Sequence, residues 1–217
     1  TNNSWQRRND FPHPGDKTLN KILPFSLQYN NQAYIVLKNN TSIEIWRYND
    51  ETDTWYLLTY YPGKGIEQLT CFILNGKLFL GGGSRYFTGN LDENSYYDFW
   101  EYNFETTKWA QKNDIPIKRF GFEGNLACCT QDNQVFVFSY ANELWQYNPE
   151  QDSWSRKMKF PGPTRIISNL IEKNNKLYLI GGSYSNYGSY GLKDCWEYTI
   201  NSNSWELVAF MPQLYSY

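Results

Sequence analysis

Three features of this 217-residue sequence predict an all-β fold made of repeated four-stranded sheets. The first is a Trp followed nine residues later by a second Trp, an arrangement that occurs four times. The pairs are Trp46 and Trp55, Trp100 and Trp109, Trp145 and Trp154, and Trp196 and Trp205. The second is an aromatic content of 19% without long apolar stretches, which favours short, half-buried strands. The third is a set of Asn-rich turns that precede short apolar runs.

Each Trp pair lies in a fixed frame of other residues. An acid stands two residues before the first Trp, a Tyr two residues after it, and a Pro seven residues after the second Trp. The acids are Glu44, Asp98, Glu143 and Asp194; the Tyr residues are Tyr48, Tyr102, Tyr147 and Tyr198; the Pro residues are Pro62, Pro116, Pro161 and Pro212. Trp5 and Pro12 keep the last interval, so the beginning of the chain joins the series. This period of about 50 residues indicates a repeat architecture.

Strand pairing explains the spacing. A Trp and a Tyr two residues apart lie on one face of a strand, and a polar turn such as 148–153 brings the second Trp onto the neighbouring strand. Two further extended stretches precede each hairpin. They are 23–29 and 34–37, 69–74 and 78–80, 121–130 and 135–138, and 166–171 and 177–180. Four antiparallel strands per repeat at this period are typical of a β-propeller blade.

The fourth repeat carries the fullest signature, with Leu177 to Gly182, then Asp194 to Tyr198, and then Trp205. It resembles a kelch repeat, and the resemblance extends over nearly the whole chain. It implies a kelch-type β-propeller of four four-stranded blades plus one strand of a further blade, as an open arc or part of a larger ring. The double Gly of 181–182 recurs at 81–82. It is replaced at 38–39 and 139–140, where we expect a different strand geometry.

We expect one propeller segment over residues 1–217, divided at the connecting Pro residues. Residues 1–13 are predicted to be the outer strand of an incomplete blade and 213–217 the start of the next one. The complete blades are predicted at 14–62, 63–116, 117–161 and 162–212. Because an open propeller leaves apolar faces uncovered, we expect further blades from the same longer chain or from a partner. A closed four-bladed ring is the alternative.

Composition and charge exclude several function classes. The chain has 20 Lys and Arg against 22 Asp and Glu, with no basic run longer than Arg7-Arg8, so nucleic acid is not an expected partner. No stretch is apolar enough to be a transmembrane segment. Cys71, Cys128, Cys129 and Cys195 lack the CxxC spacing of a zinc site and are expected to be buried free thiols, with a disulfide as the alternative.

Enzymatic function is the second hypothesis. Galactose oxidase shares the kelch-type fold and binds copper through two His and two Tyr, but His13 is the only His here, so no cofactor is expected. A sugar mutarotase or glycoside hydrolase would need carboxylates near the central channel. Glu67, Glu123 and Glu172 lie on or beside predicted inner strands, at different repeat positions. The favoured hypothesis is therefore a non-catalytic binding scaffold.

Two long segments are the candidate binding surface. Strand alternation places the second-to-third-strand loops and the blade-to-blade connections on one side, and Ser84–Tyr97 and Ser183–Lys193 are long there. Their Tyr, Ser, Gly and Asn content resembles an antibody paratope and also suits sugar rings. A basic residue follows each connecting Pro, as in many kelch repeats. The predicted contacts to a protein partner or glycan are Tyr86, Phe87, Tyr96, Tyr97, Arg119, Arg165, Tyr184, Tyr187 and Tyr190.

Structural alternatives accompany these predictions. The basic residues could brace adjacent blades, and the long loops could be insertions without function. The Trp and Tyr series is expected to form the core between blades, and the acid before each Trp is expected to accept hydrogen bonds from backbone donors. Abundant Tyr and Asn without a BTB domain resemble kelch segments of bacterial surface and secreted proteins. An extracellular or cell-surface location is therefore expected, with the cytoplasm as the alternative.

Overall fold

All regular structure in the described part of the chain is β-strand. The computed structural model describes residues 4–12, 25–39, 42–67, 69–84, 95–117, 126–166, 168–183 and 191–212. Their strands form four antiparallel sheets, each built from four consecutive strands in chain order. Across these residues no helix has the length and hydropathy to cross a membrane. The predicted all-β repeat fold is confirmed.

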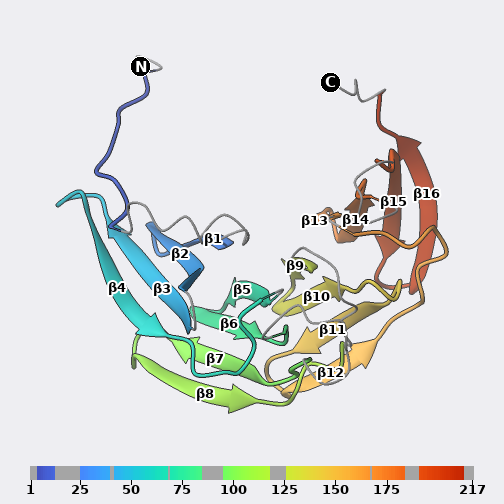
Figure 1. Cartoon of the computed structure of the whole chain (residues 1–217). Helices are drawn as coiled ribbons and strands as arrows, with labels where there is room; N and C mark the ends of the chain where they lie inside the picture. Colours follow the sequence, from blue (N-terminus) through green and yellow to red (C-terminus); the bar gives the residue numbers. More distant parts are fainter. Residues whose placement is uncertain are drawn as a thin grey trace. The chain divides into compact units, whose positions relative to one another are not determined.

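The chain divides into two compact units, residues 1–61 and 62–217. The first unit contains one sheet, shown in blue in Figure 1. Its strands are β1 (Phe25–Tyr29), β2 (Gln32–Asn39), β3 (Ser42–Asn49) and β4 (Thr54–Tyr60). β1 and β2 are joined by Asn30 and Asn31, which have φ of 51° and 59°. Two-residue hairpins favour this left-handed backbone, and Asn adopts it more readily than most residues.

The second unit contains three sheets that follow one another from green through yellow to red in Figure 1. The strands of the first are β5 (Thr70–Leu74), β6 (Lys77–Gly81), β7 (Phe99–Asn103) and β8 (Lys108–Lys112). Those of the second are β9 (Ala127–Gln131), β10 (Gln134–Phe138), β11 (Leu144–Asn148) and β12 (Ser153–Arg156). Those of the third are β13 (Asn169–Lys173), β14 (Lys176–Ile180), β15 (Asp194–Thr199) and β16 (Ser204–Phe210). The first strands are neighbours, with β9 contacting both β5 and β13.

Strand register sorts the side chains of each sheet onto two faces. In β9–β12, Val135 pairs with Tyr147 and Tyr147 with Trp154, so these three share one face, here called the Trp face. The opposite, or back, face carries Phe136 and Phe138. Two core clusters show how the sheets stack. The first joins the back face of β5–β8 to the Trp face of β9–β12, and the second joins the back face of β9–β12 to the Trp face of β13–β16. The predicted role of the Trp and Tyr series in the core is confirmed for these sheets.

Residues 4–12 are not in a strand, which differs from the outer strand predicted around Trp5. A strand is defined by backbone pairing, and no described residue pairs with this segment as a ladder. The side chain of Trp5 is accordingly exposed. The residues that replace the double Gly also have a different strand geometry, as expected. β2 continues through Lys38 and Asn39. Ser139 instead begins a tight turn, in which its N–H donates a hydrogen bond to the Glu143 carbonyl.

All four cysteines are free, as predicted, but only Cys71 is fully buried and the other three are half-buried. Burial raises the pKa of the Cys128 thiol to about 11. Its Sγ lies 3.6 Å from the carbonyl oxygen of Cys71 and donates to it. These thiols are therefore protonated at neutral pH and pack as small side chains.

The turn between the third and fourth strands holds one left-handed residue in every sheet. These residues are Asp53, Thr107, Asp152 and Asn203, with φ of 53°, 56°, 48° and 51°. Asp and Asn tolerate this conformation, whereas it is unfavourable for a β-branched residue. Thr107 is therefore the strained member of the series.

Replacing Thr107 with Asn is expected to raise the free energy of unfolding by about 1 kcal/mol, because the left-handed backbone costs Asn less than Thr. Urea denaturation followed by Trp fluorescence would measure the change. Thr106→Asn is the matched control, since Thr106 is exposed and has no positive φ. Equal effects of the two substitutions would show that backbone strain is not the cause.

Candidate functional site

The two long loops begin and end in closely similar stems. Ser84 forms isolated bridges with Glu67 and Ser95, and Ser183 forms them with Ile166 and Gly191. In the first stem, Ser84 N–H donates a hydrogen bond of 2.9 Å to the Glu67 carbonyl. In the second, Ser183 N–H donates one of 2.9 Å to the Ile166 carbonyl. Each loop base is thus tied to the connection that enters its own sheet. Both stems lie beside these connections, as strand alternation predicts for the ends of the two segments.

Glycine is required at the residue that precedes each loop stem. Gly83 and Gly182 have φ of 92° and 100°, which L side chains rarely adopt. A Cβ at Gly83 would lie 2.3 Å from the Glu67 carbonyl oxygen, and one at Gly182 would lie 2.7 Å from that of Ile166. These glycines therefore let each loop stem approach the connection. The bridges align Gly82–Gly83 with Gly181–Gly182, one residue later than the pair at 81–82 expected from the sequence. In the sheets that lack them, β1–β4 and β9–β12, the second strand is followed by the third after only two and five residues.

The structure places only three of the predicted contact residues. Tyr96 and Tyr97 are half-buried and follow the first stem, where Tyr96 N–H donates to the Gly83 carbonyl and the Tyr97 carbonyl accepts from Ile115 N–H. Arg165 precedes the second stem. The remaining six lie outside the described residues: Tyr86, Phe87, Arg119, Tyr184, Tyr187 and Tyr190.

Arg165 is not available to a partner, because its side chain is 0% exposed. Its guanidinium donates two hydrogen bonds to Asp194, at 2.9 and 2.7 Å, and one to the Gly181 carbonyl at 3.0 Å. The same group lies 4.6 Å from the ring centre of Phe160. This bidentate, enclosed geometry is typical of a structural ion pair. The prediction of Arg165 as a contact residue is therefore corrected. Its hydrogen bonds brace its own predicted blade, and only its contact with the Phe160 ring reaches the blade before, so the alternative of bracing adjacent blades is met only in part.

The acid before each Trp has a role that the sequence analysis did not identify. In all four sheets its carboxylate accepts a hydrogen bond from the indole N–H of the Trp two residues later. The distances are 2.8 Å for Glu44, 2.9 Å for Asp98, 3.1 Å for Glu143 and 2.7 Å for Asp194. A backbone donor is found as well at Asp98, which accepts from Lys64 N–H at 3.0 Å. The expectation that these acids accept from backbone donors was therefore incomplete. The fixed spacing of two residues between acid and Trp could have indicated the hydrogen bond to the indole N–H.

A second repeated contact, here called the latch, ties a sheet to the segment that enters it. The left-handed residue of the outer turn accepts the hydroxyl of the repeat Tyr, as in Tyr147 to Asp152 at 2.8 Å and Tyr198 to Asn203 at 2.6 Å. It also accepts a backbone N–H four residues after the preceding outer Trp. Asn113 N–H donates to Asp152 at 3.1 Å, and Met158 N–H donates to Asn203 at 2.8 Å.

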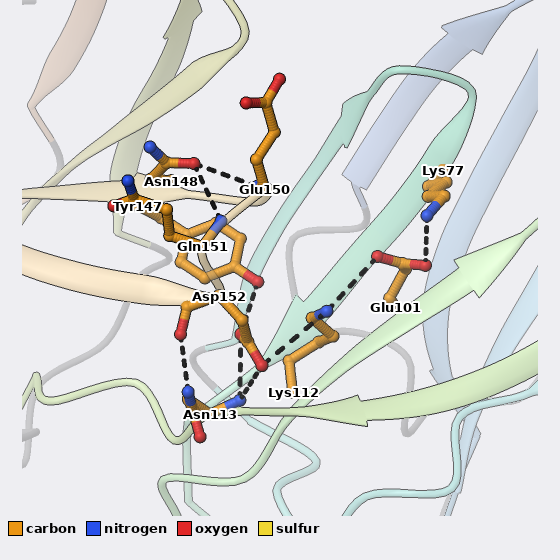
Figure 2. A network of polar contacts seen from close by, with 9 residues as sticks. All are labelled: Lys77, Glu101, Lys112, Asn113, Tyr147, Asn148, Glu150, Gln151 and Asp152. Carbon is orange, nitrogen blue, oxygen red and sulfur yellow. Dashed lines mark hydrogen bonds and ion pairs between the residues drawn. The ribbon is translucent and has the colours of Figure 1, made fainter.

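Figure 2 shows the latch between β5–β8 and β9–β12 within a wider polar network. Glu101 lies 2.7 Å from Lys77 and 3.9 Å from Lys112, and Lys112 lies 3.8 Å from Asp152. These two Lys and two acidic side chains alternate in charge from β6 to the β11–β12 turn and balance one another. The network therefore links the strands of β5–β8 to the outer turn of β9–β12.

The first unit contains the same latch, made by residues 9–11. Asn9 N–H donates to Asp53 at 3.0 Å and its side-chain amide donates to the Asp53 carbonyl at 2.8 Å. Phe11 lies 5.1 and 5.2 Å from the rings of Trp46 and Trp55. In the second unit Phe160 holds the equivalent place, 5.1 Å from Trp196 and from Trp205. Residues 9–11 thus occupy the repeat position that the Trp5 interval indicated.

Two of the three carboxylates considered for an enzyme, Glu67 and Glu172, lie at different positions of the repeat. Glu67 lies at the first loop stem, whereas Glu172 lies at the far end of β13, where it accepts from Asn175 N–H in the following turn. When the two sheets are aligned at their loop stems, Glu67 matches Ile166. Glu172 lies six residues beyond that position, or about 20 Å along an extended strand. Glu123 lies outside the described residues. Nor do the described residues contain a group of three or more His, Cys, Asp or Glu that could hold a metal ion.

Comparisons with known proteins show which proteins this chain resembles in sequence and in fold. No protein-family model matches the chain. Kelch-like protein 15 of Mus musculus, and likewise that of Rattus norvegicus, is 21% identical over 149 residues, covering 57% of this chain and 24% of the relative. The chain thus spans about a quarter of the length of these relatives.

A solved structure extends the likeness. The structure of YjhT matches with a TM-score of 0.65 at 18% identity, covering 88% of this chain and 67% of the other. At 18% identity this match supports a shared fold and nothing further. Together with the repeated Trp signature and the four four-stranded antiparallel sheets, it shows that this chain is a kelch-repeat β-propeller in fold.

Proposed function

We propose that this chain is a non-catalytic scaffold that binds a protein partner through its long-loop side. The observation that supports the proposal is the pair of matching stems at Ser84 and Ser183, each of which holds the ends of an aromatic-rich segment against the connection that enters its sheet. Loops on a rigid scaffold are a common place for recognition. Kelch-like relatives and the fold are consistent with such a scaffold.

The aromatic side chains of the two long segments suit binding to a partner better than they suit catalysis. The segments 85–94 and 184–190 contribute Tyr86, Phe87, Tyr184, Tyr187 and Tyr190. Aromatic rings of this kind supply large contact areas at low entropic cost and dominate many interfaces. Tyr96 and Tyr97 add two half-buried rings at the base of the first loop. A glycan is the second candidate ligand, because the same rings can stack on sugars.

The test replaces the loops and keeps their stems. Residues 85–94 and 184–190 are exchanged for Gly-Ser segments of equal length, separately and together, and the purified chains are used as bait for partner proteins and on glycan arrays. We expect the double exchange to weaken binding at least about tenfold, since each loop contributes aromatic anchors. The control changes Asn201 and Ser202 to Gly in a short turn at the opposite end of β15.

The outcomes separate the candidates. A partner kept by the control and lost on loop exchange supports the proposal, with the array showing whether that partner is a glycan. A partner kept by the double exchange contradicts it. Turnover of a sugar that Glu67→Gln abolishes would favour the enzyme hypothesis instead. An extracellular or cell-surface location stays a prediction, which export of the full-length gene product would test.

A further inference from the structure

The outer strand of the β13–β16 sheet is apolar where the outer strands of the two preceding sheets are polar. Leu207, Val208 and Phe210 stand two, three and five residues after the outer Trp of their repeat, and they are 42%, 43% and 69% exposed. The same positions are polar or charged in the two repeats before. They hold Gln111, Lys112 and Asp114 after Trp109, and Arg156, Lys157 and Lys159 after Trp154.

The exposed apolar side chains lie where a following sheet would not cover them. Register pairs Leu207 with Trp196 and Phe210 with Asp194, so both side chains belong to the Trp face. That face packs against the preceding sheet, β9–β12. Exposed apolar residues occur at the same repeat positions in β4 of the first unit, namely Leu57 and Tyr60. Since three further sheets follow β4 in the chain, this exposure belongs to the repeat position itself.

The segment that enters the sheet extends this apolar margin and adds positive charge. Met158 N–H donates to Asn203 at 2.8 Å, and the indole N–H of Trp205 donates to the Met158 carbonyl at 3.1 Å. Met158 therefore lies beside the beginning of β16, and it is 51% exposed. Lys157 and Lys159 flank Met158 in the chain. The apolar margin is thus bordered by basic residues.

The backbone of β16 has a free edge, because β16 is the outermost strand of its sheet and pairs only with β15 among the described strands (Figure 1). Proteins usually protect such an edge with Lys or other charges, or by keeping the strand short. β12 has four residues, and β8 has Lys108 and Lys112 at its ends. β16 has seven residues, and its only charge, Glu206, lies on the back face. Its register is regular from Ser204 to Leu207, so this stretch can accept another strand.

We propose that the outer edge of β16 binds an extended segment of a partner protein that is rich in apolar and acidic residues. The segment adds a fifth strand to the sheet, with its backbone paired to β16 and its apolar side chains beside Leu207 and Met158. Acidic residues of the segment complement Lys157 and Lys159. This contact is separate from the long loops and does not depend on the function proposed for them.

Selection from a random peptide library displayed on phage, with the whole chain as the target, tests the proposal. We expect the enriched peptides to combine alternating apolar residues with Asp or Glu. Leu207→Glu should weaken their binding at least about tenfold, because it places a negative charge in the apolar margin. Gln111→Glu is the matched control, since Gln111 is exposed and holds the same repeat position on β8. Fluorescence anisotropy of labelled peptides would measure the dissociation constants.

Backbone methylation of an enriched peptide separates strand pairing from side-chain contact. Alternate N–H groups of a strand face opposite edges, so methylation of one alternating set should abolish binding and methylation of the other set should not. Equal effects of the two sets would overturn the proposal. Equal affinities for Leu207→Glu and Gln111→Glu, or a selection that enriches no peptide, would overturn it too. Peptides that lose affinity only when the long loops are exchanged would also contradict it, while supporting the function proposed for those loops.

Discussion

Asp194→Asn is expected to lower the free energy of unfolding by about 3–5 kcal/mol, the usual effect of removing one partner from a buried ion pair. The guanidinium of Arg165 is fully enclosed, and two of its hydrogen bonds end on Asp194. The amide replaces the carboxylate without changing its size, so the loss comes from leaving the buried positive charge unpaired. Equilibrium urea denaturation would measure it.

The repeat supplies its own control in Glu143→Gln. Glu143 holds the same repeat position and also accepts from a Trp, but its partner Arg156 has a side chain that is 63% exposed. Exposed ion pairs contribute little, so the expected loss is below about 1 kcal/mol. Similar losses at the two positions would show that burial of Arg165 does not set the size of the effect.

The Asp194 effect should also depend on pH. Burial raises the pKa of Asp194, but hydrogen bonds from Arg165 and Trp196 outweigh this and leave it below the ordinary value of 3.8. A carboxyl group whose pKa is lower in the folded state stabilises fully above the unfolded value and loses that contribution as the pH falls through the folded value. The difference between wild type and Asp194→Asn should therefore be constant near neutral pH and shrink below pH 3.8.

Phe99→Ala is expected to cost about 3–5 kcal/mol, because it leaves a large cavity between two sheets. Phe99 is fully buried, and its ring lies 5.1 Å from that of Tyr147 and 5.3 Å from that of Trp154. It therefore joins β5–β8 to β9–β12. Differential scanning calorimetry and urea denaturation would both report the loss.

Phe210→Ala is the control for Phe99→Ala, since Phe210 is 69% exposed on β16 and its truncation should cost little. Phe99→Leu should recover much of the loss, because it fills most of the volume. If Phe99→Leu were as destabilising as Phe99→Ala, edge contacts between aromatic rings, and not volume, would be the main contribution of this residue.

The number and order of strands could be predicted because local patterns determine them. Trp and Tyr two residues apart define a strand face, and Asn pairs such as Asn174-Asn175, with φ of 55° and 61°, define the hairpin turns. Contacts that join distant residues were not predictable in the same way. The bond from Asn113 to Asp152 spans 39 residues, and no property of Asn113 alone indicates its partner.

The candidate site was predictable only in outline. Loop length and composition marked the two long segments, and the Gly pairs marked where they leave the sheets. The environment of Arg165 was not visible, since a basic residue after a Pro serves equally well as a surface contact or as a brace. What decides between them is Asp194, which lies 29 residues further along the chain.

The latch has a consequence for how the second unit can be rearranged. Because Asn113 N–H binds Asp152 and Met158 N–H binds Asn203, the outer turns of β9–β12 and β13–β16 are each held by a segment that follows the preceding sheet. A module that can be exchanged or duplicated therefore begins at one outer Trp and ends before the next, instead of matching a sheet. A chimaera cut at Trp109 and Trp154 keeps both latches within native sequence, whereas a cut just after Pro116 and Pro161 separates Asn113 from the module that contains Asp152.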